Sequence, residues 1–363
     1  MIAYDNEKKI PPKSTRHLVN MENQEEEIVV QPQEEVVEKQ IDLFKNRIDL
    51  NELSQAVADI REQLGKVIIG QQDTIQLLVT SMLCGGHVLL EGVPGVAKTL
   101  TAKLLAQTLD VSFKRIQFTP DLMPSDILGT SVFNPKLLEF EYKKGPVYSN
   151  LVLIDEINRS PAKTQAALFE LMEEKQVTID GQSYPMHEPF MVLATQNPIE
   201  QEGTYRLPEA QLDRFFMKIS VGYPTAIEEI EILKKFNYTT QKQVAETVNS
   251  ILDKQQIVSL KSTIQSIILE DNLLKYITDI VQATRNHKQI ELGASPRASL
   301  ALMMASKATA AINGRDFVIP EDLKAVGKSI LRHRIILTAE TEMEGISEDE
   351  VLNELFATIE IPR

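Results

Sequence analysis

The chain has 363 residues, of which 43% are hydrophobic and 25% charged, and its formal net charge is −14. It is long enough for two or more domains with proper cores, and no run of 18 apolar residues predicts a membrane span. The negative charge argues against a general affinity for nucleic acid, although it does not exclude a local basic pore. The single cysteine, Cys84, cannot form an internal disulfide, and we expect it to be a small buried residue. Since the N-terminus lacks an apolar signal segment, the sequence favours a cytoplasmic protein.

The composition of the first 45 residues indicates that they form no packed structure. Seven glutamates and one lysine lie between Glu22 and Gln40, and such a segment buries too little apolar surface to order itself. We therefore expect residues 1–45 to form a disordered acidic leader, in which Met21 is a candidate alternative start. A second acidic stretch, from Glu340 to Glu354, has seven carboxylates and no basic residue. We interpret it as a solvated helix face and loop.

Hydrophobic periodicity next predicts helices that alternate with short strands. Helices are expected over residues 46–64 and 72–83, and a third should follow a glycine-bearing loop and end near residue 109. Short apolar runs predict strands at 87–91, 113–118, 151–154, 190–195 and 215–219. Strands that alternate with helices predict a parallel sheet covered on both faces.

Beyond residue 223 the pattern is helical almost to the end of the chain. The expected helices cover 225–237, 254–269, 272–287, 296–312, 320–336 and 347–358. The predicted fold class is therefore α/β. A nucleotide-binding domain at 46–223, with a parallel sheet flanked by helices, is followed by a smaller all-helical domain at 224–363.

Two segments interrupt the alternation, at 119–148 and 175–189. In the first, residues 140–142 and 146–148 are interpreted as the strands of a small hairpin. In the second, polar and apolar residues alternate around Asp180-Gly181, which suits a two-residue hairpin turn. We interpret both as insertions on one edge of the nucleotide domain, where function is often grafted.

The sequence Gly-Val-Pro-Gly-Val-Ala-Lys-Thr at 92–99 is typical of a phosphate-binding loop. Its backbone N–H groups and the start of the next helix would face the anion, Lys98 would reach the β- and γ-phosphates, and Thr99 would ligate Mg²⁺. One position departs from the usual pattern, since Ala97 stands where a glycine usually precedes the lysine. The loop alone does not decide between a nucleotide site and a chance match.

Two carboxylates follow the most apolar predicted strand. Residues 151–154 are all apolar, and Asp155 and Glu156 come directly after them, at the end of the strand where ligands bind in open α/β sheets. In a nucleotide site Asp155 would bind the Mg²⁺ shell, and Glu156 would orient and polarise the attacking water. Strands often merely end at acidic residues, but this spacing after a phosphate loop favours the functional interpretation.

Three further residues are candidates with an open alternative. Asn197 would hydrogen-bond the γ-phosphate or the lytic water, but Asn-Pro more often marks a turn. Arg214 suits the charge on a transferring phosphoryl group, yet most Asp-Arg neighbours are only solvated ion pairs. Arg297 lies in the first turn of a helix that begins at Ser295-Pro296, where the macrodipole disfavours a cation unless a phosphate is bound. For Arg297 the phosphate interpretation is slightly favoured.

Together these residues resemble the MoxR family of AAA+ ATPases. The resemblance covers about residues 46–336, and the matching motifs lie at 69–71, 92–99, 118–126, 154–159, 194–198, 209–215 and 293–297. MoxR proteins typically carry an alanine at the position of Ala97, so the departure in the loop fits the family. One position differs: family members commonly have proline where Arg206 stands.

The resemblance implies a role for each matching residue. Lys98 and Thr99 match the lysine and hydroxyl of Walker A, whereas Asp155 and Glu156 match Walker B, with Thr99 and Asp155 on the metal. ATP and Mg²⁺ are thus the implied substrate and cofactor. The implied nucleotide-binding residues are Ile68, Ile69 and Gly70 in the adenine pocket, and Gly92, Val93, Pro94, Gly95, Val96, Ala97, Lys98, Thr99 and Leu100 in and after the loop.

The remaining matches imply a site shared between subunits. Asn197 matches the first sensor, and Arg297 matches the second sensor on a helical lid. Arg214 matches the arginine finger, which acts on ATP held by the neighbouring subunit, so hydrolysis implies a ring, most often a hexamer. The insertions at 119–148 and 175–189 match hairpins that face the pore or a partner in this branch.

The leading hypothesis is therefore an ATP-driven chaperone that remodels or matures partner proteins, often with a von Willebrand factor A domain partner. One alternative is a nucleotide-gated assembly scaffold that hydrolyses too slowly to perform work, although Glu156 and Arg214 speak against it. Another is a DNA motor related to the minichromosome-maintenance helicases, which the acidic charge disfavours.

Overall fold

The structure is a computed structural model that describes residues 48–198, 205 and 207–362. Residues from Ile48 onward form one compact unit. The predicted acidic leader at 1–45, with Met21, lies outside the described residues, as does Arg206.

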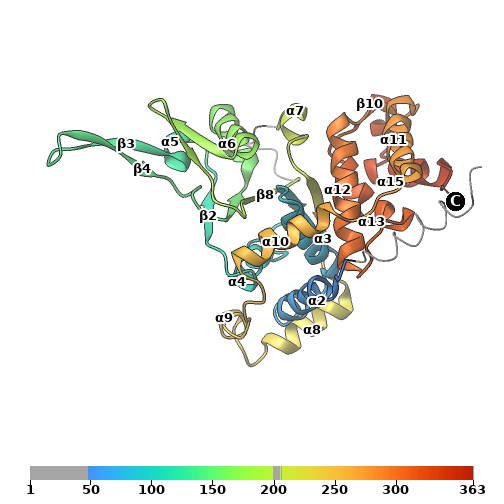
Figure 1. The fold of residues 1–363 in the computed structure, drawn as a ribbon, viewed down its shortest axis with the longest axis horizontal. Coiled ribbons are helices and arrows are strands. Elements are labelled where there is room, and N and C mark those ends of the chain that lie inside the picture. The colour runs from blue at the N-terminus through green and yellow to red at the C-terminus, as the bar shows by residue number, and fades with distance from the viewer. Residues whose placement is uncertain (1–47, 199–204, 206, 363) are drawn as a thin grey trace, which may run out of the picture. The chain divides into compact units, whose positions relative to one another are not determined.

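Five parallel strands form the central sheet (Figure 1). Their order across the sheet is β2-β5-β8-β1-β9. Their bounds are Val88–Gly92 for β1, Phe113–Gln117 for β2, Leu151–Asp155 for β5, Met191–Gln196 for β8 and Met217–Val221 for β9. The predicted parallel sheet is confirmed, and the long crossovers that parallel pairing requires are supplied by helices.

Both faces of the sheet are buried, and successive residues along a strand face opposite sides. In β5, Leu151 and Leu153 belong to one hydrophobic cluster, whereas Val152 and Ile154 belong to the other. The neighbouring strand β8 alternates in the same way, with Leu193 in the first cluster. Strands buried on both sides read as continuous apolar runs, which is why the sequence pattern identified them.

Helices cover the two faces unequally. The first cluster is covered by N-terminal helices and by most of the C-terminal helices, and the second mainly by α5 and α6. The helices before residue 215 are α2 (Asn51–Gly65), α3 (Gln72–Cys84), α4 (Lys98–Thr108), α5 (Pro124–Leu128), the short η1 (Ile157–Arg159), α6 (Ala162–Glu174) and α7 (Glu209–Leu212).

The C-terminal part is almost entirely helical, as predicted. Its elements are α8 (Ala226–Phe236), α9 (Gln241–Ala245), α10 (Lys254–Gln265), α11 (Asp271–Asn286), β10 (Ile290–Leu292), α12 (Pro296–Ile312), α13 (Pro320–Leu331), β11 (Ile336–Leu337), α14 (Ala339–Met343) and α15 (Glu348–Thr358). The expected start of α12 is confirmed: the Ser295 hydroxyl accepts from the Arg297 N–H and Pro296 opens the helix. Helix α13 ends earlier than predicted, because the chain turns at His333 and Arg334, whose side chains bond the Phe215 carbonyl just before β9.

The prediction for the first hairpin was wrong in its register. Strand β3 (Gly129–Asn134) pairs with β4 (Glu139–Lys144), so the strand that was expected at 146–148 is absent from the hairpin. Pro146 has no N–H to donate to a ladder, and Val147 is buried in the second cluster instead. The second hairpin is confirmed: β6 (Gln176–Ile179) pairs with β7 (Gln182–Pro185) around Asp180-Gly181.

The last sheet strand lies two residues later than predicted. The apolar run at Phe215-Phe216 does not pair in the sheet, because its backbone is bonded elsewhere. The Phe216 N–H donates to the His87 carbonyl at 2.7 Å, and the Phe215 carbonyl accepts from the Arg334 guanidinium at 2.6 Å. Directly before this run, Asp213 contacts Ser295 at the start of α12, and Arg214 contacts Glu173 at the end of α6.

Two smaller expectations concern membranes and the cysteine. No helix among the described residues has both the length and the apolar character to cross a membrane. Cys84 is partly rather than fully buried, and it packs against the first cluster, with its Sγ 3.5 Å from the Met304 carbonyl.

Truncating a central core side chain tests this packing. We expect Leu193→Ala to lower the free energy of unfolding by about 2–5 kcal/mol, because it removes apolar contacts and leaves a cavity in a fully buried strand. Urea denaturation measures the change. Leu138→Ala, at a position that is 75% exposed, is the control and should change stability by less than ~0.5 kcal/mol. Equal effects of the two substitutions would contradict the placement of β8 in the core.

Candidate nucleotide-binding site

The predicted phosphate-binding loop joins β1 to α4. Gly92 ends the strand, and Ala97 is the N-cap of the helix, so that Lys98 and Thr99 are its first two residues. The N–H groups of a first helical turn have no partner within the helix and favour an anion. The Gln71 side-chain amide donates to the Val96 carbonyl at 3.1 Å, which ties the loop to the segment before α3.

Ala97 has a left-handed backbone, with φ of +59°. For a residue with a Cβ this conformation costs roughly 1–2 kcal/mol, which is why glycine usually occupies such positions. The helix that starts at Lys98 and the Gln71 contact hold the loop in this conformation. Ala97 thus adopts the backbone conformation that glycine usually adopts at this position of the loop.

Lys98 lies close to the carboxylates of the site. Its ammonium donates to the Gly92 carbonyl, and burial lowers its pKa below the ordinary value. The nearby carboxylates of Asp155, Glu156 and Glu91 act in the opposite direction and favour the charged form. A positive group is therefore held at the mouth of the loop.

Asp155 is buried at the carboxyl end of β5, and both of its carboxylate oxygens have polar partners. Its Oδ1 accepts from the Thr195 hydroxyl at 2.6 Å, and its Oδ2 lies 3.3 Å from the Thr99 hydroxyl. The Arg115 guanidinium also pairs with Oδ2, at 2.8 Å from Nη2 and 2.9 Å from Nε. The structure therefore brings together Thr99 and Asp155, the two predicted metal ligands.

Glu156 follows in a left-handed backbone conformation, with φ of +59°. Its N–H donates to the Thr195 hydroxyl at 2.9 Å. Its carboxylate accepts from the Gln117 amide at 2.8 Å and pairs with Arg159 at 3.1 Å, while remaining about one-third exposed. The carboxylate is thus oriented but accessible to solvent.

Asn197 lies at the same edge of the sheet. It is buried and directly follows β8, whose last residue Gln196 stands opposite Glu91 of β1 in the register. Because β8 lies between β1 and β5, Asn197 is placed between the loop that follows β1 and the Asp155 carboxylate at the end of β5.

A pocket of about 390 Å³ lies at the expected position of the base. Ile69 and Gly70 line it, whereas Ile68 is buried in the first cluster and does not. The opposite wall, from Ser220 to Pro224 with Glu228 of α8, was missed by the sequence interpretation. A turn signal at Gly222-Tyr223-Pro224 was visible there, but nothing in the sequence placed it beside Gly70.

The two candidate arginines lie together elsewhere. Arg214 donates to the Phe169 carbonyl at 2.9 Å and pairs with one carboxylate oxygen of Glu173 at 2.9 Å, and Arg297 pairs with the other oxygen. An adjacent pocket of about 320 Å³ is lined by both arginines and by none of residues 92–100. The structure therefore joins Arg214 to Arg297, and it does not join either to the loop of the same chain.

Comparison with known proteins agrees with this geometry. The model of the family described as "ATPase family associated with various cellular activities (AAA)" matches residues 87–217, and that of the AAA lid domain matches 282–355. Chaperone MoxR1 of Mycobacterium tuberculosis is 41% identical over 87% of this chain and 84% of its own length. Protein MoxR of Paracoccus denitrificans is 32% identical over 84% of this chain and 96% of its own length. The chain belongs to the MoxR family of AAA+ ATPases.

A solved structure supports the fold of this MoxR-family chain. A protein from Cytophaga hutchinsonii that has been assigned as an ATPase is 43% identical, with a TM-score of 0.78 over 92% of this chain and all of its own. The family resemblance and the α/β fold with a helical lid are thus confirmed. The MoxR-family chain is an ATPase.

Two polar side chains of the site were missed in the sequence. Arg115 and Gln117 alternate with apolar residues on β2, and such residues in an edge strand are usually solvated. In the structure they instead bond Asp155, the last residue of the neighbouring strand β5, and Glu156, which follows it. Their two-residue spacing on one strand face was the available signal.

Glycine at the strained loop position provides one test. We expect Ala97→Gly to raise the free energy of unfolding by roughly 0.5–1 kcal/mol, because it relieves the left-handed conformation, less the entropy that glycine gains when unfolded. Ala166→Gly, on the exposed side of α6, is the control and should lower it by about 0.5–1 kcal/mol. Denaturation with urea compares the two. If both variants lose stability equally, the backbone at Ala97 is not left-handed.

Removing the loop lysine tests nucleotide binding. We expect Lys98→Ala to weaken ATP binding by at least about tenfold, because a charge-assisted contact of this kind contributes about 1.5–3 kcal/mol. A fluorescent ATP analogue measures the affinity. Lys103→Ala, an exposed position on the same helix, should leave the affinity unchanged. An equal affinity of the Lys98 variant would rule out the loop as the phosphate site.

Proposed function

We propose that this ATPase holds ATP between the loop at 92–100 and the pocket beside Ile69 and Gly70. The observation that carries the proposal is the meeting of Lys98, Thr99, Asp155 and Glu156 at one end of the sheet. Lys98 would bind the terminal phosphates, and the N–H groups at the start of α4 would bind the others.

The donors at the site also fit Mg²⁺. The Thr99 hydroxyl and the Asp155 carboxylate are 3.3 Å apart, and hydroxyl, carboxylate and phosphate oxygens are the ligands that Mg²⁺ prefers. When bound, the ion would supply charge neutralisation at the phosphates. Arg115, which now neutralises Asp155, would give up this contact.

Glu156 is proposed to orient and polarise the attacking water, with Asn197 beside it. In support, its carboxylate is accessible, and Gln117 and Arg159 fix its direction. Glu156 is also near enough to Lys98 of the loop for its charge to favour the protonated ammonium, which opposes the fall in the Lys98 pKa.

The position of the arginines supports a site shared between subunits. Since Arg214 and Arg297 lie together and apart from the loop of their own chain, we propose that both reach ATP held by a neighbouring subunit. A guanidinium there would stabilise the charge of the transferring phosphoryl group. Such sites close into a ring, for which six subunits are expected.

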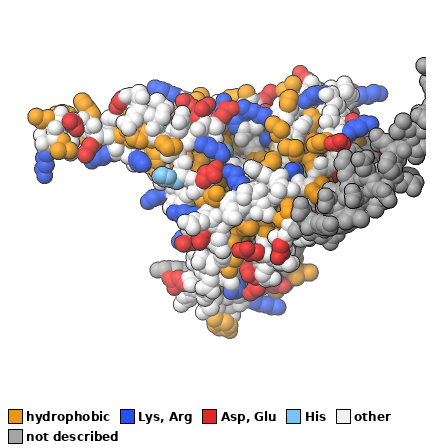
Figure 2. All heavy atoms as spheres, in the orientation of Figure 1, with side chains coloured by type: hydrophobic (Ala, Val, Ile, Leu, Met, Phe, Trp, Pro, Cys, Tyr) orange, Lys and Arg blue, Asp and Glu red, His pale blue; other side chains and the backbone are white. Residues whose placement is uncertain are grey.

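We further propose that the ring acts in the cytoplasm as a chaperone that remodels or matures partner proteins, including one with a von Willebrand factor A domain. The hairpin of β3 and β4 supports a contact with partners. The hairpin projects from the rest of the fold (Figure 1), and apolar side chains gather at its tip (Figure 2), where Leu138 is 75% and Phe140 71% exposed. An exposed apolar patch of this kind marks an interaction site.

We also propose that the chain divides functionally near residue 223. Residues 46–223 would bind and hydrolyse ATP, and 224–363 would act as the lid that carries Arg297. The separate matches of the two family models, at 87–217 and 282–355, support this division.

Mixing two inactive variants tests the shared site. We expect Glu156→Gln to keep ATP binding while its turnover falls by at least about 100-fold, because the water is no longer polarised. Arg214→Ala should lose activity to a similar extent. In mixed assemblies, an Arg214→Ala subunit has an intact Glu156, and a neighbouring Glu156→Gln subunit supplies an intact Arg214. Part of the activity should therefore return. Phosphate release over several turnovers measures it.

Each variant alone, at the same total concentration, is the control for mixing. Activity that does not return would count against a site completed by the neighbouring subunit. Substantial hydrolysis by Glu156→Gln alone would show that another residue handles the water.

A further inference from the structure

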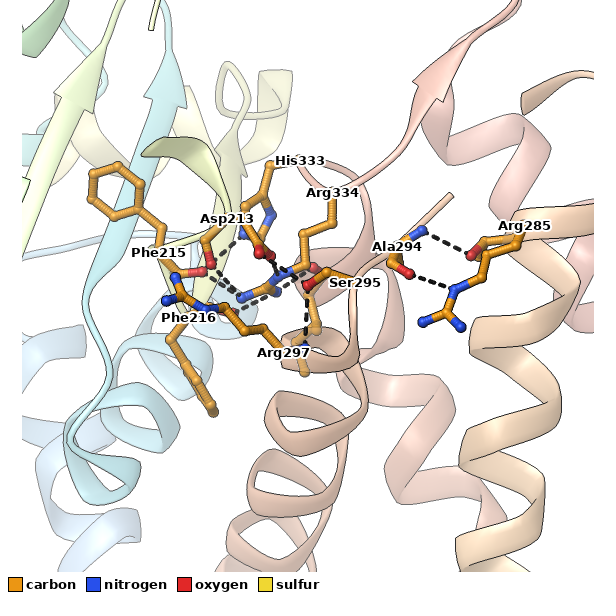
Figure 3. Close-up of polar contacts among 11 residues, drawn as sticks. Asp213, Phe215, Phe216, Arg285, Ala294, Ser295, Arg297, His333 and Arg334 are labelled. Carbon is orange, nitrogen blue, oxygen red and sulfur yellow. Dashed lines mark hydrogen bonds and ion pairs between the residues drawn. The ribbon is translucent and has the colours of Figure 1, made fainter. Parts of the chain in front are cut away.

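Asp213 stands directly before Arg214 in the chain and contacts the C-terminal helices at two points (Figure 3). Its Oδ2 accepts from the Ser295 hydroxyl at 2.9 Å, and its Oδ1 accepts from the Arg334 Nε at 2.8 Å. Ser295 caps α12, two residues before Arg297. One carboxylate therefore connects the Arg214 segment to the helix that carries Arg297.

Arg334 also bonds the backbone of the segment that follows Asp213. Its guanidinium donates to the carbonyl of Phe215 at 2.6 Å and to that of Phe216 at 3.2 Å. The side chain is almost completely buried, and a buried guanidinium needs a counter-charge, which Asp213 supplies. The segment from Asp213 to Phe216 is thus fixed by a residue that follows α13.

The neighbouring histidine adds no competing charge. His333 lies beside the Phe215 carbonyl, at 3.0 Å from Nε2. Burial and the adjacent Arg334 hold the pKa of His333 well below its ordinary value, so the ring is neutral. Asp213 is the carboxylate that pairs with the buried guanidinium of Arg334.

The arginines themselves form the second link. Glu173 of α6 pairs with Arg214 and Arg297 at once. The Arg214 segment and the start of α12 are joined through Asp213 on one side and through Glu173 on the other. Any shift of the lid that moves Ser295 and Arg334 must therefore move the backbone that carries Arg214.

We propose that Asp213 is a positioning residue, through which Ser295 and Arg334 of the lid set the place of Arg214 at the neighbouring subunit's ATP. The inference rests on the proposed function, in which Arg214 acts on that ATP. It adds that the lid of one subunit positions Arg214 of that subunit, which then acts on ATP bound by the next subunit.

The first test is Asp213→Asn, which keeps the size of the side chain and removes the charge. We expect an ATP affinity within about twofold of the wild type and a kcat lower by about 10- to 100-fold, as a displacement of about 1 Å can cause. The ATP pocket of this variant is intact, and only the group that it offers to its neighbour is displaced.

Mixed assemblies distinguish a displaced Arg214 in Asp213→Asn from a general loss of structure in that variant. Asp213→Asn mixed with Glu156→Gln should regain activity, because Asp213→Asn offers an intact pocket and Glu156→Gln an intact Arg214. Asp213→Asn mixed with Arg214→Ala should show no gain over the low rate of Asp213→Asn alone, because neither variant offers a well-placed arginine. A variant that is merely misfolded would regain activity with neither partner, and that outcome overturns the inference.

Ser295→Ala provides a second variant, in case the unpaired Arg334 prevents Asp213→Asn from folding. It keeps the Asp213–Arg334 pair and removes the other lid contact. Its control is Ser347→Ala, because Ser347 also caps a helix, α15, but its hydroxyl contacts Glu350 of that helix and not Asp213. We expect a several-fold lower kcat for Ser295→Ala, with the same mixing pattern, and an unchanged kcat for Ser347→Ala.

The outcomes for the two proposals differ. If Arg214→Ala is not restored by Glu156→Gln, the proposed shared site is overturned, and this inference falls with it. If Arg214→Ala is restored, but Asp213→Asn and Ser295→Ala turn over at the wild-type rate, only the inference is overturned.

Discussion

The burial of the sheet on both faces is the constraint on which the rest of the structure depends. The inner strands β5, β8 and β1 are buried along almost their whole length, as β5 is from Leu151 to Ile154, whereas the edge strands β2 and β9 also carry exposed polar residues. Polar chemistry is then confined to the strand ends, and parallel pairing brings the carboxyl ends to one edge. The loop after β1, the carboxylates after β5 and Asn197 after β8 meet at that edge for this reason.

This constraint also explains how much could be predicted from the sequence. Lys98, Thr99, Asp155 and Glu156 follow apolar runs directly, so their place at the edge could be inferred from local pattern. The continuous apolar runs of β5 and β8 predicted buried strands, and their alternation with helices predicted a parallel sheet. The same logic failed at Phe215-Phe216, an apolar run whose carbonyls accept from Arg334 of a distant segment, so that pairing with β1 begins only at Met217.

Contacts between distant segments could not be predicted in this way. Glu173 resembles any carboxylate at the end of an amphipathic helix, and its partner Arg297 lies 124 residues further along the chain. The hairpin register was missed for a related reason. Strands β3 and β4 expose apolar side chains at their tip instead of burying them, so alternation gave no guide to which residues pair.

The first hydrophobic cluster has a consequence for dividing the protein into pieces. It includes side chains of the sheet, of α3 and of α12, although the two family models match separate stretches of sequence. A fragment that ended after β9 would expose to water the face of α3 that α12 covers. The two parts are therefore joined by a single core, and the exchange of lids between relatives would require compatible packing on α3.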